Sequence, residues 1–501
     1  MHSRVVATAL FAALLTGCAH DGDAADGEMV VGGSPLEILH DPETCRSCHP
    51  KHVREWSASM HAYAAEDPVF AAMNRRGQEE TGGELGDFCI SCHAPMAVAL
   101  GLTQDGLNLD EVPPKYEGVT CYFCHNVESV ATEHDNPLKV PANNPLRLAH
   151  DKTMRGGVTD ARRPGAHAVA YSPMHDGDLP ASAQLCGPCH DIVTAAGVHL
   201  ERTFQEWKDS VFSRTDGGSF NSCVGCHMPS RDDLIAETHE VAVTARRRGF
   251  HGHLMPGVDA ALTPFPDHEA HLSAIECELA EAVQVTQMTV QPNGQVTLEI
   301  ETSRTGHGWP SGSAQDRRAW VEVRAYDAAG RLRVSIGAID NDKPLPRSDP
   351  QLFVMRDFIY GADGEEVHMF WDASPSAAHP AGYRSTTLPI TLPSAQRAGV
   401  PPPHHVEAQF MTFMDPARVE VAIKIRPIGF DLVDDLIASG HLPQDTDLKS
   451  RIQTHTLNLT KMVWDRTTDS SRTVEVPAAE PLDCPNRWLC QLYPGRPGCG
   501  G

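Results

Sequence analysis

The sequence has few of the side chains that usually build a large protein core, and few basic residues. Aromatic residues make up only 6% of the 501 positions, although 41% are hydrophobic. Charged residues make up 21%, below the quarter that is typical of soluble chains, and acidic residues outnumber basic ones by 66 to 41. The net charge of −25 disfavours binding to nucleic acid and favours basic partners or metal ions.

Several catalytic patterns, and any long apolar run after the N-terminal segment, are also missing. We find no P-loop, no GxGxxG or GxSxG turn and no HExxH zinc motif. Beyond residue 17, no apolar segment is long enough to cross a bilayer. The chain is instead rich in two residue types, with 15 cysteines and 27 histidines. These counts indicate a function that uses cysteine and histidine side chains.

Most of the cysteines lie in five C-x-x-C-H motifs, the attachment signature of c-type haem. On one helical turn the two thiols and the histidine share a face. The thiols can then bond the haem vinyl groups while the histidine reaches the iron. Zinc sites and redox dithiols also use C-x-x-C pairs, but neither needs a histidine directly afterwards. We therefore predict five covalently bound haems c at Cys45, Cys48 and His49; Cys89, Cys92 and His93; Cys121, Cys124 and His125; Cys186, Cys189 and His190; and Cys223, Cys226 and His227.

Five haems between residues 45 and 227 would be densely packed. Their porphyrins would supply the apolar interior that the few aromatic side chains do not provide. Haems this close together would also let electrons hop along the array. The spacing of the motifs therefore favours electron transfer.

The sixth ligand of each iron separates an electron carrier from an enzyme. An iron bound by two histidines is closed, whereas an open position can bind substrate. No motif has lysine in place of its final histidine. From their local context we predict the distal ligands His61, His167, His175, His253 and His307, with His52, His150, His239 and His251 as alternatives.

The periodicity of the sequence changes near residue 281. Apolar residues then alternate with polar ones in several runs, which is the pattern of half-buried strands. Asn293-Gly294 fits a tight turn before the first run. We expect an α+β multidomain fold, with a mostly helical or irregular multihaem domain at 41–280 and an antiparallel β-sandwich domain with terminal helices at 281–465. Since His307 lies between glycines on a loop of the second domain, it could join that domain to a haem.

Residues 1–17 resemble the signal peptide of a bacterial lipoprotein. A basic Arg4 precedes an apolar run that ends in Leu15-Thr16-Gly17-Cys18. The resemblance implies that Cys18 carries lipid and that 18–40 is a flexible tether. We therefore expect a location in the cell envelope, either periplasmic or at the outer membrane.

Four cysteines belong neither to a haem motif nor to the lipoprotein signal. An exported chain meets an oxidising environment, so one or two disulfides are expected among them, but the sequence does not determine the pairing. Three lie in a predicted tail at 466–501. The four cysteines are Cys277, which precedes the tail, and Cys484, Cys490 and Cys499, which lie in it.

The motif regions resemble the multihaem cytochrome superfamily that includes the tetrahaem acceptor of hydroxylamine oxidoreductase and relatives of pentahaem nitrite reductase. The resemblance implies that distal histidines such as His61 and His253 bind haem. Nitrite reductases have a lysine-bound haem, and hydroxylamine oxidoreductases have eight haems and a cross-linking tyrosine, so this chain departs from both. The residues that carry the resemblance are Cys45 to Ala65 with Trp56 and Ser59, Gly118 to Cys121 with Phe123, Leu185 to Asp191, Thr203, Glu206, Trp207, Ser210, Cys226 to Pro229, and Gly306, His307 and Pro310.

These features predict a protein that carries electrons through five haems between redox partner proteins of the periplasm or outer membrane. The alternative is an oxidoreductase that acts on a small nitrogen or sulfur compound of the nitrite, hydroxylamine or tetrathionate class at one open haem. A third hypothesis is that the protein is a subunit of a surface complex and that its β domain binds other subunits. The presence or absence of a distal histidine at each haem discriminates between the first two.

Overall fold

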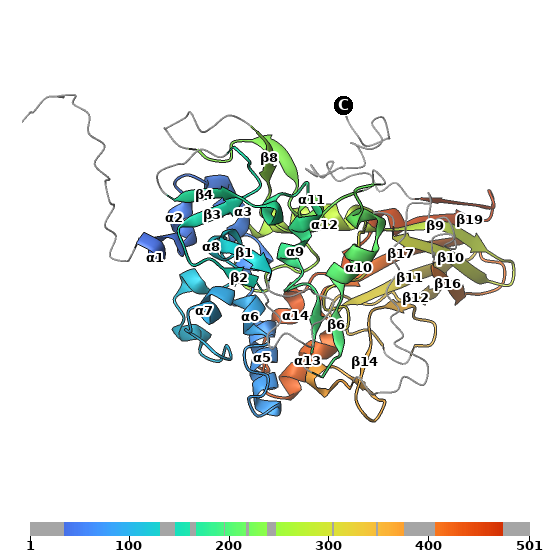
Figure 1. Cartoon of the computed structure of the whole chain (residues 1–501). Coiled ribbons are helices and arrows are strands. Elements are labelled where there is room, and N and C mark those ends of the chain that lie inside the picture. Colours follow the sequence, from blue (N-terminus) through green and yellow to red (C-terminus); the bar gives the residue numbers. More distant parts are fainter. Residues whose placement is uncertain are drawn as a thin grey trace, which may run out of the picture.

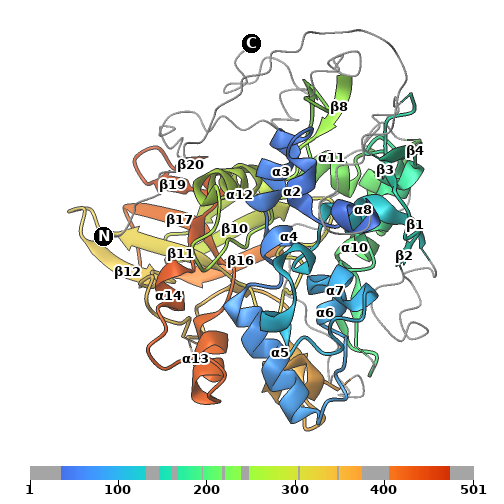
Figure 2. The same ribbon diagram turned by 90° about the vertical axis from the view of Figure 1, so that its left-hand side faces the viewer.

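The computed structural model places helices and strands in different halves of the chain. Short helices dominate the first half, and long antiparallel strands form a unit of their own in the second (Figures 1 and 2). The predicted α+β multidomain class is therefore confirmed. The structure describes residues 35–130, 146–160, 167–194, 196–216, 220–237, 247–302, 305–346, 349–374 and 406–473.

Several predicted features lie outside these described residues. Cys277, on helix α12 (His268–Ala282), forms a disulfide bond. The predicted features outside the described residues are the signal peptide 1–17, Cys18, the alternative ligand His239, and the tail cysteines Cys484, Cys490 and Cys499.

The helices of the N-terminal domain are short and start at residues suited to a helix N-terminus. Five of them begin with proline, whose fixed φ and missing amide hydrogen fit the first helical position. The carboxylate of Asp67 caps α5 by accepting hydrogen bonds from the amides of Val69 and Phe70 at 2.7 and 3.2 Å. The helices are α1 (Pro35–Leu39), α2 (Pro42–Cys45), α3 (Pro50–Ser57), α4 (Met60–Tyr63), α5 (Pro68–Glu80), α6 (Ile90–His93), α7 (Pro95–Ala99), α8 (Cys121–Asn126), α9 (Ala183–Cys186), α10 (Thr203–Asp209) and α11 (Cys223–His227).

Two-stranded ladders connect the loops between these helices. Three are antiparallel, whereas β3 and β4 run parallel. Because the strands are so short, each ladder fixes a loop and does not build a layer of its own. The strands are β1 (Val127–Val130), β2 (Leu146–Leu148), β3 (Thr153–Gly156), β4 (Ala168–Tyr171), β5 (Ile192–Val193), β6 (His199–Glu201), β7 (Ser230–Asp233) and β8 (Arg247–His251).

In the second half, two antiparallel sheets pack face to face, as the alternating pattern predicts. One has the strand order β16-β10-β9, and the other has the order β12-β11-β17-β19-β20 with β13 and β18 beside it. Alternate residues of both sheets meet in one apolar core, in which Leu298, Val321 and Ile423 are fully buried. The strands are β9 (Val283–Val290), β10 (Gln295–Thr302), β11 (Arg318–Tyr326), β12 (Leu332–Ile336), β13 (Val354–Met355), β16 (Val406–Met411), β17 (Arg418–Arg426), β18 (His455–Thr456), β19 (Met462–Asp465) and β20 (Ser470–Thr473).

The packing of α12 and of α13 helps to join the domains. Leu272, Ile275 and Leu279 of α12 belong to the sandwich core, although these residues precede the predicted boundary at 281. Helix α13 (Phe430–Ala438) packs beside α5 in an apolar cluster, as Figures 1 and 2 show. The haem motifs and the β domain therefore share one continuous interface. No helix in the described ranges is long and apolar enough to cross a membrane.

Candidate haem-binding centre

Each C-x-x-C-H motif folds as a single helical turn, as predicted. The amides of His49, His93 and His190 donate to the carbonyls of Cys45, Cys89 and Cys186 at 2.8, 3.3 and 3.1 Å. The third and fifth motifs lie within α8 and α11. This geometry places both thiols and the imidazole of a motif on one side of the turn.

Side-chain caps define where two of these turns begin. The hydroxyl of Thr120, directly before α8, accepts the amide of Phe123 at 3.3 Å. The hydroxyl of Ser222, directly before α11, accepts the amide of Gly225 at 3.0 Å. A short polar residue just before the first cysteine is therefore part of what makes the motif helical.

Hydrogen bonds at Nδ1 orient the imidazole rings of all five motif histidines. No described residue forms a hydrogen bond to their Nε2 atoms, so this nitrogen is left to bind iron. His190 differs from the others because its Nδ1 bonds to the carboxylate of Glu201 at 3.1 Å. The other four rings bond to backbone carbonyls: His49 to Ile235 at 2.7 Å, His93 to Ala64 at 2.8 Å, His125 to Arg155 at 2.6 Å and His227 to Pro256 at 2.8 Å.

Four of the five motif histidines face a second histidine across a gap of one size. An ion held between two imidazole nitrogens at about 2 Å each separates the ring centroids by roughly 6 Å. The residues present therefore fit a haem iron with two histidine ligands at four positions. The centroid separations are 6.5 Å for His49 and His167, 6.2 Å for His190 and His61, 6.4 Å for His125 and His253, and 6.3 Å for His227 and His307.

Burial holds three of the four opposing rings in the neutral form that binds metal. Burial lowers the pKa of His61 and of His253 to about 3, and that of His307 to about 4. For His190, burial alone would lower the pKa, but the hydrogen bond and charge of Glu201 outweigh it and raise the pKa to about 9.

The structure brings His167, and not His175, opposite a motif histidine. Both ring nitrogens of His175 are engaged, Nδ1 with the hydroxyl of Ser172 at 2.9 Å and Nε2 with the carbonyl of Cys124 at 2.8 Å. Its ring stacks on that of His125, with 5.6 Å between centroids and 24° between planes. The sequence predicts both as distal ligands, because both flank the same turn.

The alternative candidates have other contacts. His52 packs against Phe250 with 4.1 Å between centroids, and Nδ1 of His251 bonds to the carbonyl of Met228 at 2.7 Å. The backbone amide of His150 donates to the side chain of Asn126. None of the three lies opposite a motif histidine at the separation of the four pairs.

The second motif is the exception. Within the described residues, no histidine ring faces His93 as in the other four motifs. Its ring instead stacks on Phe70 of α5, with 3.8 Å between centroids and 5° between planes. Burial lowers the pKa of His93, so this ring too is neutral.

Cysteines of different motifs lie next to one another, which shows how the motifs are arranged. The side chain of Cys45 lies beside that of Cys121, Cys92 lies beside Cys189, and Cys186 lies beside Cys223. Cys124 also lies near Cys186 and Cys189. The first motif therefore neighbours the third, and the fourth motif neighbours the second, third and fifth.

The β domain contributes His307 through a loop that docks on α10. The carboxylate of Glu206 accepts the amide of Gly308 at 2.9 Å and the hydroxyl of Ser311 at 3.3 Å. Trp207 lies so close to Gly306 that an added Cβ would stand 3.4 Å from its indole ring. The expectation that this loop reaches the haem motifs agrees with its position.

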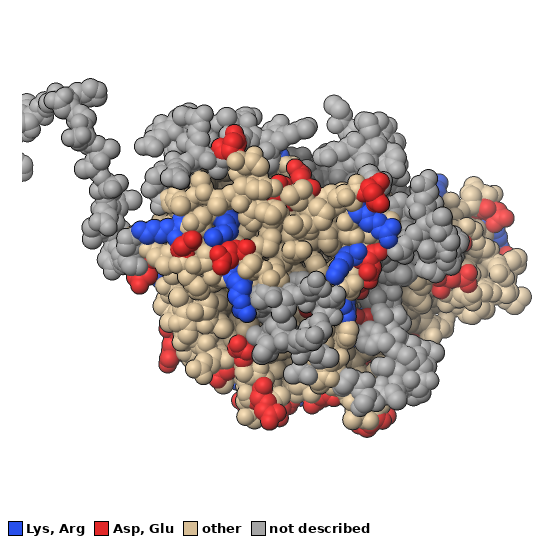
Figure 3. Space-filling model, in the orientation of Figure 1, with Lys and Arg blue, Asp and Glu red and all other residues tan. Residues whose placement is uncertain are grey.

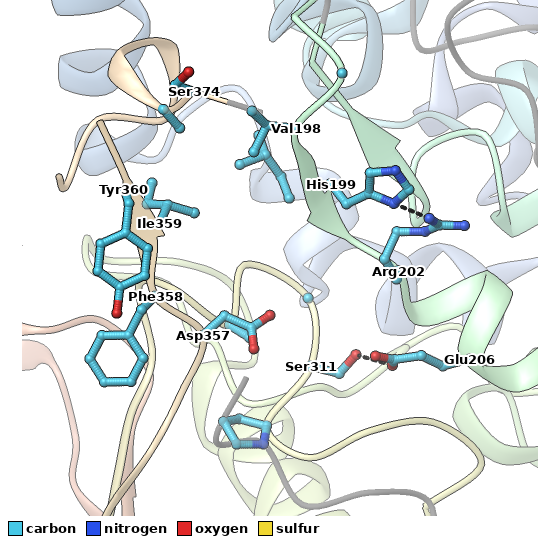
Figure 4. A pocket seen from close by; sticks show the side chains of 16 residues that line it. Val198, His199, Arg202, Glu206, Ser311, Asp357, Phe358, Ile359, Tyr360 and Ser374 are labelled. Atoms are coloured by element: carbon cyan, nitrogen blue, oxygen red, sulfur yellow. Dashed lines mark hydrogen bonds between the residues drawn. The ribbon is translucent and has the colours of Figure 1, made fainter. Parts of the chain in front are cut away.

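A cavity of about 390 Å³ lies at the same junction. Figure 4 shows His199, Arg202 and Glu206 on one wall and Asp357 and Tyr360 on the other. His199 bonds to Arg202, which also pairs with Asp191. The walls therefore come from both domains.

Glu55 is a supporting residue that the sequence analysis missed. Its buried carboxylate accepts the amide of His253 at 2.8 Å and pairs with Arg231 at 2.5 Å. Nothing in the helix sequence distinguishes this glutamate from an exposed one, because both partners are distant in the chain.

Replacing Glu55 with alanine should lower the free energy of unfolding by about 1–3 kcal/mol, because a buried amide loses its acceptor and Arg231 loses its main partner. Urea titration followed by circular dichroism measures the change. The matched control is Glu43→Ala, which breaks the exposed pair with Arg46 and should cost about 0.5 kcal/mol. Equal losses in both variants would contradict this role of Glu55.

Comparisons with known proteins agree with this centre. Residues 44–126, which contain the first three motifs, match a family model described as cytochrome c554 and c-prime. The fold is similar to that of a penta-haem cytochrome c552 from Thermochromatium tepidum, with a TM-score of 0.56 at 19% identity, over 85% of this chain and 99% of that one. No curated protein matches the sequence at a significant level. The family match and the similar fold thus agree with the haem-binding turns of the motifs, and both show that the chain is similar to multihaem c-type cytochromes.

Proposed function

We propose that this cytochrome relays electrons through five haems c, four of which are closed by two histidines. One observation carries the proposal: four motif histidines each face a second imidazole at 6.2–6.5 Å. An iron with both axial positions taken changes its charge without binding substrate, which suits electron transfer.

The side chains of the chain have separate roles in this proposal. The ten motif cysteines hold the haems through thioether bonds, and nine histidines supply axial nitrogens. The hydrogen bonds at Nδ1 keep each ring from rotating, so Nε2 stays directed at the iron. When bound, the haem irons supply the reversible one-electron chemistry.

The contacts between cysteines support a branched path. Because the thioether bonds lie at the edge of each haem, neighbouring cysteines bring the edges of two haems close together. The path would lead from the first haem through the third to the fourth, with the second and fifth as branches.

The partners in this proposal are redox proteins with basic docking faces. The net charge of −25 would attract such partners, and the attraction would weaken as ionic strength rises. On the face drawn in Figure 3, acidic side chains occupy the lower edge, while both signs are mixed above them.

A second candidate function is favoured by the second motif. No described histidine faces His93, and an open iron there could bind a small nitrogen or sulfur compound such as nitrite, hydroxylamine or tetrathionate. In this case the four closed haems would deliver electrons to the second one or remove them from it.

We also propose that the protein is attached to the cell envelope, periplasmic or at the outer membrane, through lipid on Cys18. The support is the sequence of residues 1–18, with its basic start, apolar run and Leu-Thr-Gly-Cys ending.

Low-temperature electron paramagnetic resonance of the oxidised protein should show four low-spin signals and one high-spin signal, each equivalent to one iron. Fewer than four low-spin signals would contradict the histidine pairs. Five low-spin signals without a high-spin component would instead remove the enzymatic candidate. A high-spin signal that changes on addition of nitrite or hydroxylamine would favour it.

Replacing His307 with alanine should convert one low-spin signal into a high-spin signal, because the fifth haem loses its distal ligand. The matched control is His175→Ala, which should leave all low-spin signals in place, since both nitrogens of that ring are already hydrogen bonded. If the His175 variant loses a low-spin signal and the His307 variant does not, the assignment is wrong.

Replacing Cys18 with serine should release the cytochrome from membranes into the soluble fraction of the envelope. Fractionation measures whether the protein stays with the membranes. Metabolic labelling with a radioactive fatty acid measures whether it carries lipid. An unlabelled native protein, or a variant that stays with the membranes, would contradict the lipid anchor.

A further inference from the structure

The hydrogen-bond partner of the fourth motif histidine carries a charge. Four motif imidazoles donate from Nδ1 to a neutral backbone carbonyl, whereas His190 donates to the carboxylate of Glu201 at 3.1 Å. The difference lies in the second shell of the iron ligand, where hydrogen bonding is known to tune metal centres.

The fold holds Glu201 in place for this contact. It ends strand β6, which pairs with β5, the strand that starts two residues after His190. Its side chain is buried, and the hydroxyl of Thr203 donates to the same oxygen at 3.3 Å. That hydroxyl also bonds to Ser311 of the β domain at 2.7 Å, so both domains fix the position of the carboxylate.

No arginine among the described residues forms an ion pair with Glu201, although Arg317 lies near it. Arg202, its neighbour in sequence, pairs with Asp191 at 2.6 Å. Arg317 pairs with Asp259. Within the described part of the chain, His190 and Thr203 are thus the groups that bond to Glu201.

A carboxylate at this position stabilises the oxidised iron. It draws the Nδ1 hydrogen toward itself, and the imidazole becomes a stronger electron donor at Nε2. The ferric form carries one more positive charge than the ferrous form, so a buried negative charge nearby favours it further. Reduction adds one electron to the iron and breaks no bond, and both effects oppose that step.

We propose that Glu201 is a positioning and tuning residue that gives the fourth haem the lowest reduction potential of the four closed haems. This inference rests on the proposed function, because it takes His190 and His61 as ligands of one iron. The fourth motif neighbours the second, third and fifth, so the haem that is hardest to reduce would stand at the branch point. Electrons would then occupy the neighbouring haems for most of the time and the fourth haem only briefly.

The test is Glu201→Gln, because the glutamine amide oxygen reproduces the neutral carbonyl that the other four histidines use. In a redox titration followed by electron paramagnetic resonance, one low-spin signal should shift to a more positive midpoint potential. That signal is assigned independently by His61→Ala, which should convert the fourth haem alone to high spin. The matched control is Glu322→Gln, which removes a buried carboxylate of the β-sandwich that pairs with Lys424.

The outcomes separate this inference from the function on which it rests. A positive shift confined to the signal that His61→Ala abolishes supports the role of Glu201. If that signal keeps its potential in Glu201→Gln, or shifts as much in Glu322→Gln, the inference is wrong while the histidine pairs stand. If His61→Ala abolishes no low-spin signal, the ligand assignment itself is wrong, and the inference falls with it.

Discussion

The arrangement of the haem-binding domain depends on the direction of its imidazole rings. An axial histidine must hold one nitrogen toward the iron while the chain around it has little regular structure. The chain meets this requirement with a hydrogen bond at Nδ1 of each motif histidine, made by loops distant in sequence. The short helices and two-stranded ladders therefore serve mainly to place carbonyl groups and opposing histidines, and the covalent haems would provide the apolar interior.

This requirement also explains why the two domains share an extended interface. The ring opposite His227 comes from the β domain, on a loop that Glu206 and Trp207 hold against α10. A loose β domain could not keep that ring within a fraction of an ångström of an axial position. The sandwich core, the packing of α12 and the contact between α5 and α13 thus contribute to ligand geometry as well as to stability.

Local sequence patterns predicted much of the fold and of the site, but they did not predict the long-range contacts. The motif turns follow from the spacing of two cysteines and one histidine, and the strands follow from alternation, as at Val321 and Val323. The choice between His167 and His175 depends on Ser172 and on a carbonyl in α8, which close on one ring only after the chain folds. The contact of Glu55 with His253 spans 198 positions, and no periodicity records a contact of that kind.

The order of the motifs in space differs from their order in the sequence. Along the sequence the fourth motif is one of five equal repeats, but in the fold its cysteines lie near those of three other motifs. A change at the first haem would alter one end of the path, whereas a change at the fourth would alter every route to the second and fifth haems. At this position the carboxylate of Glu201 accepts the hydrogen bond of the motif histidine, and both domains hold this carboxylate in place. The one charged hydrogen bond to a motif histidine therefore lies where it affects the whole array.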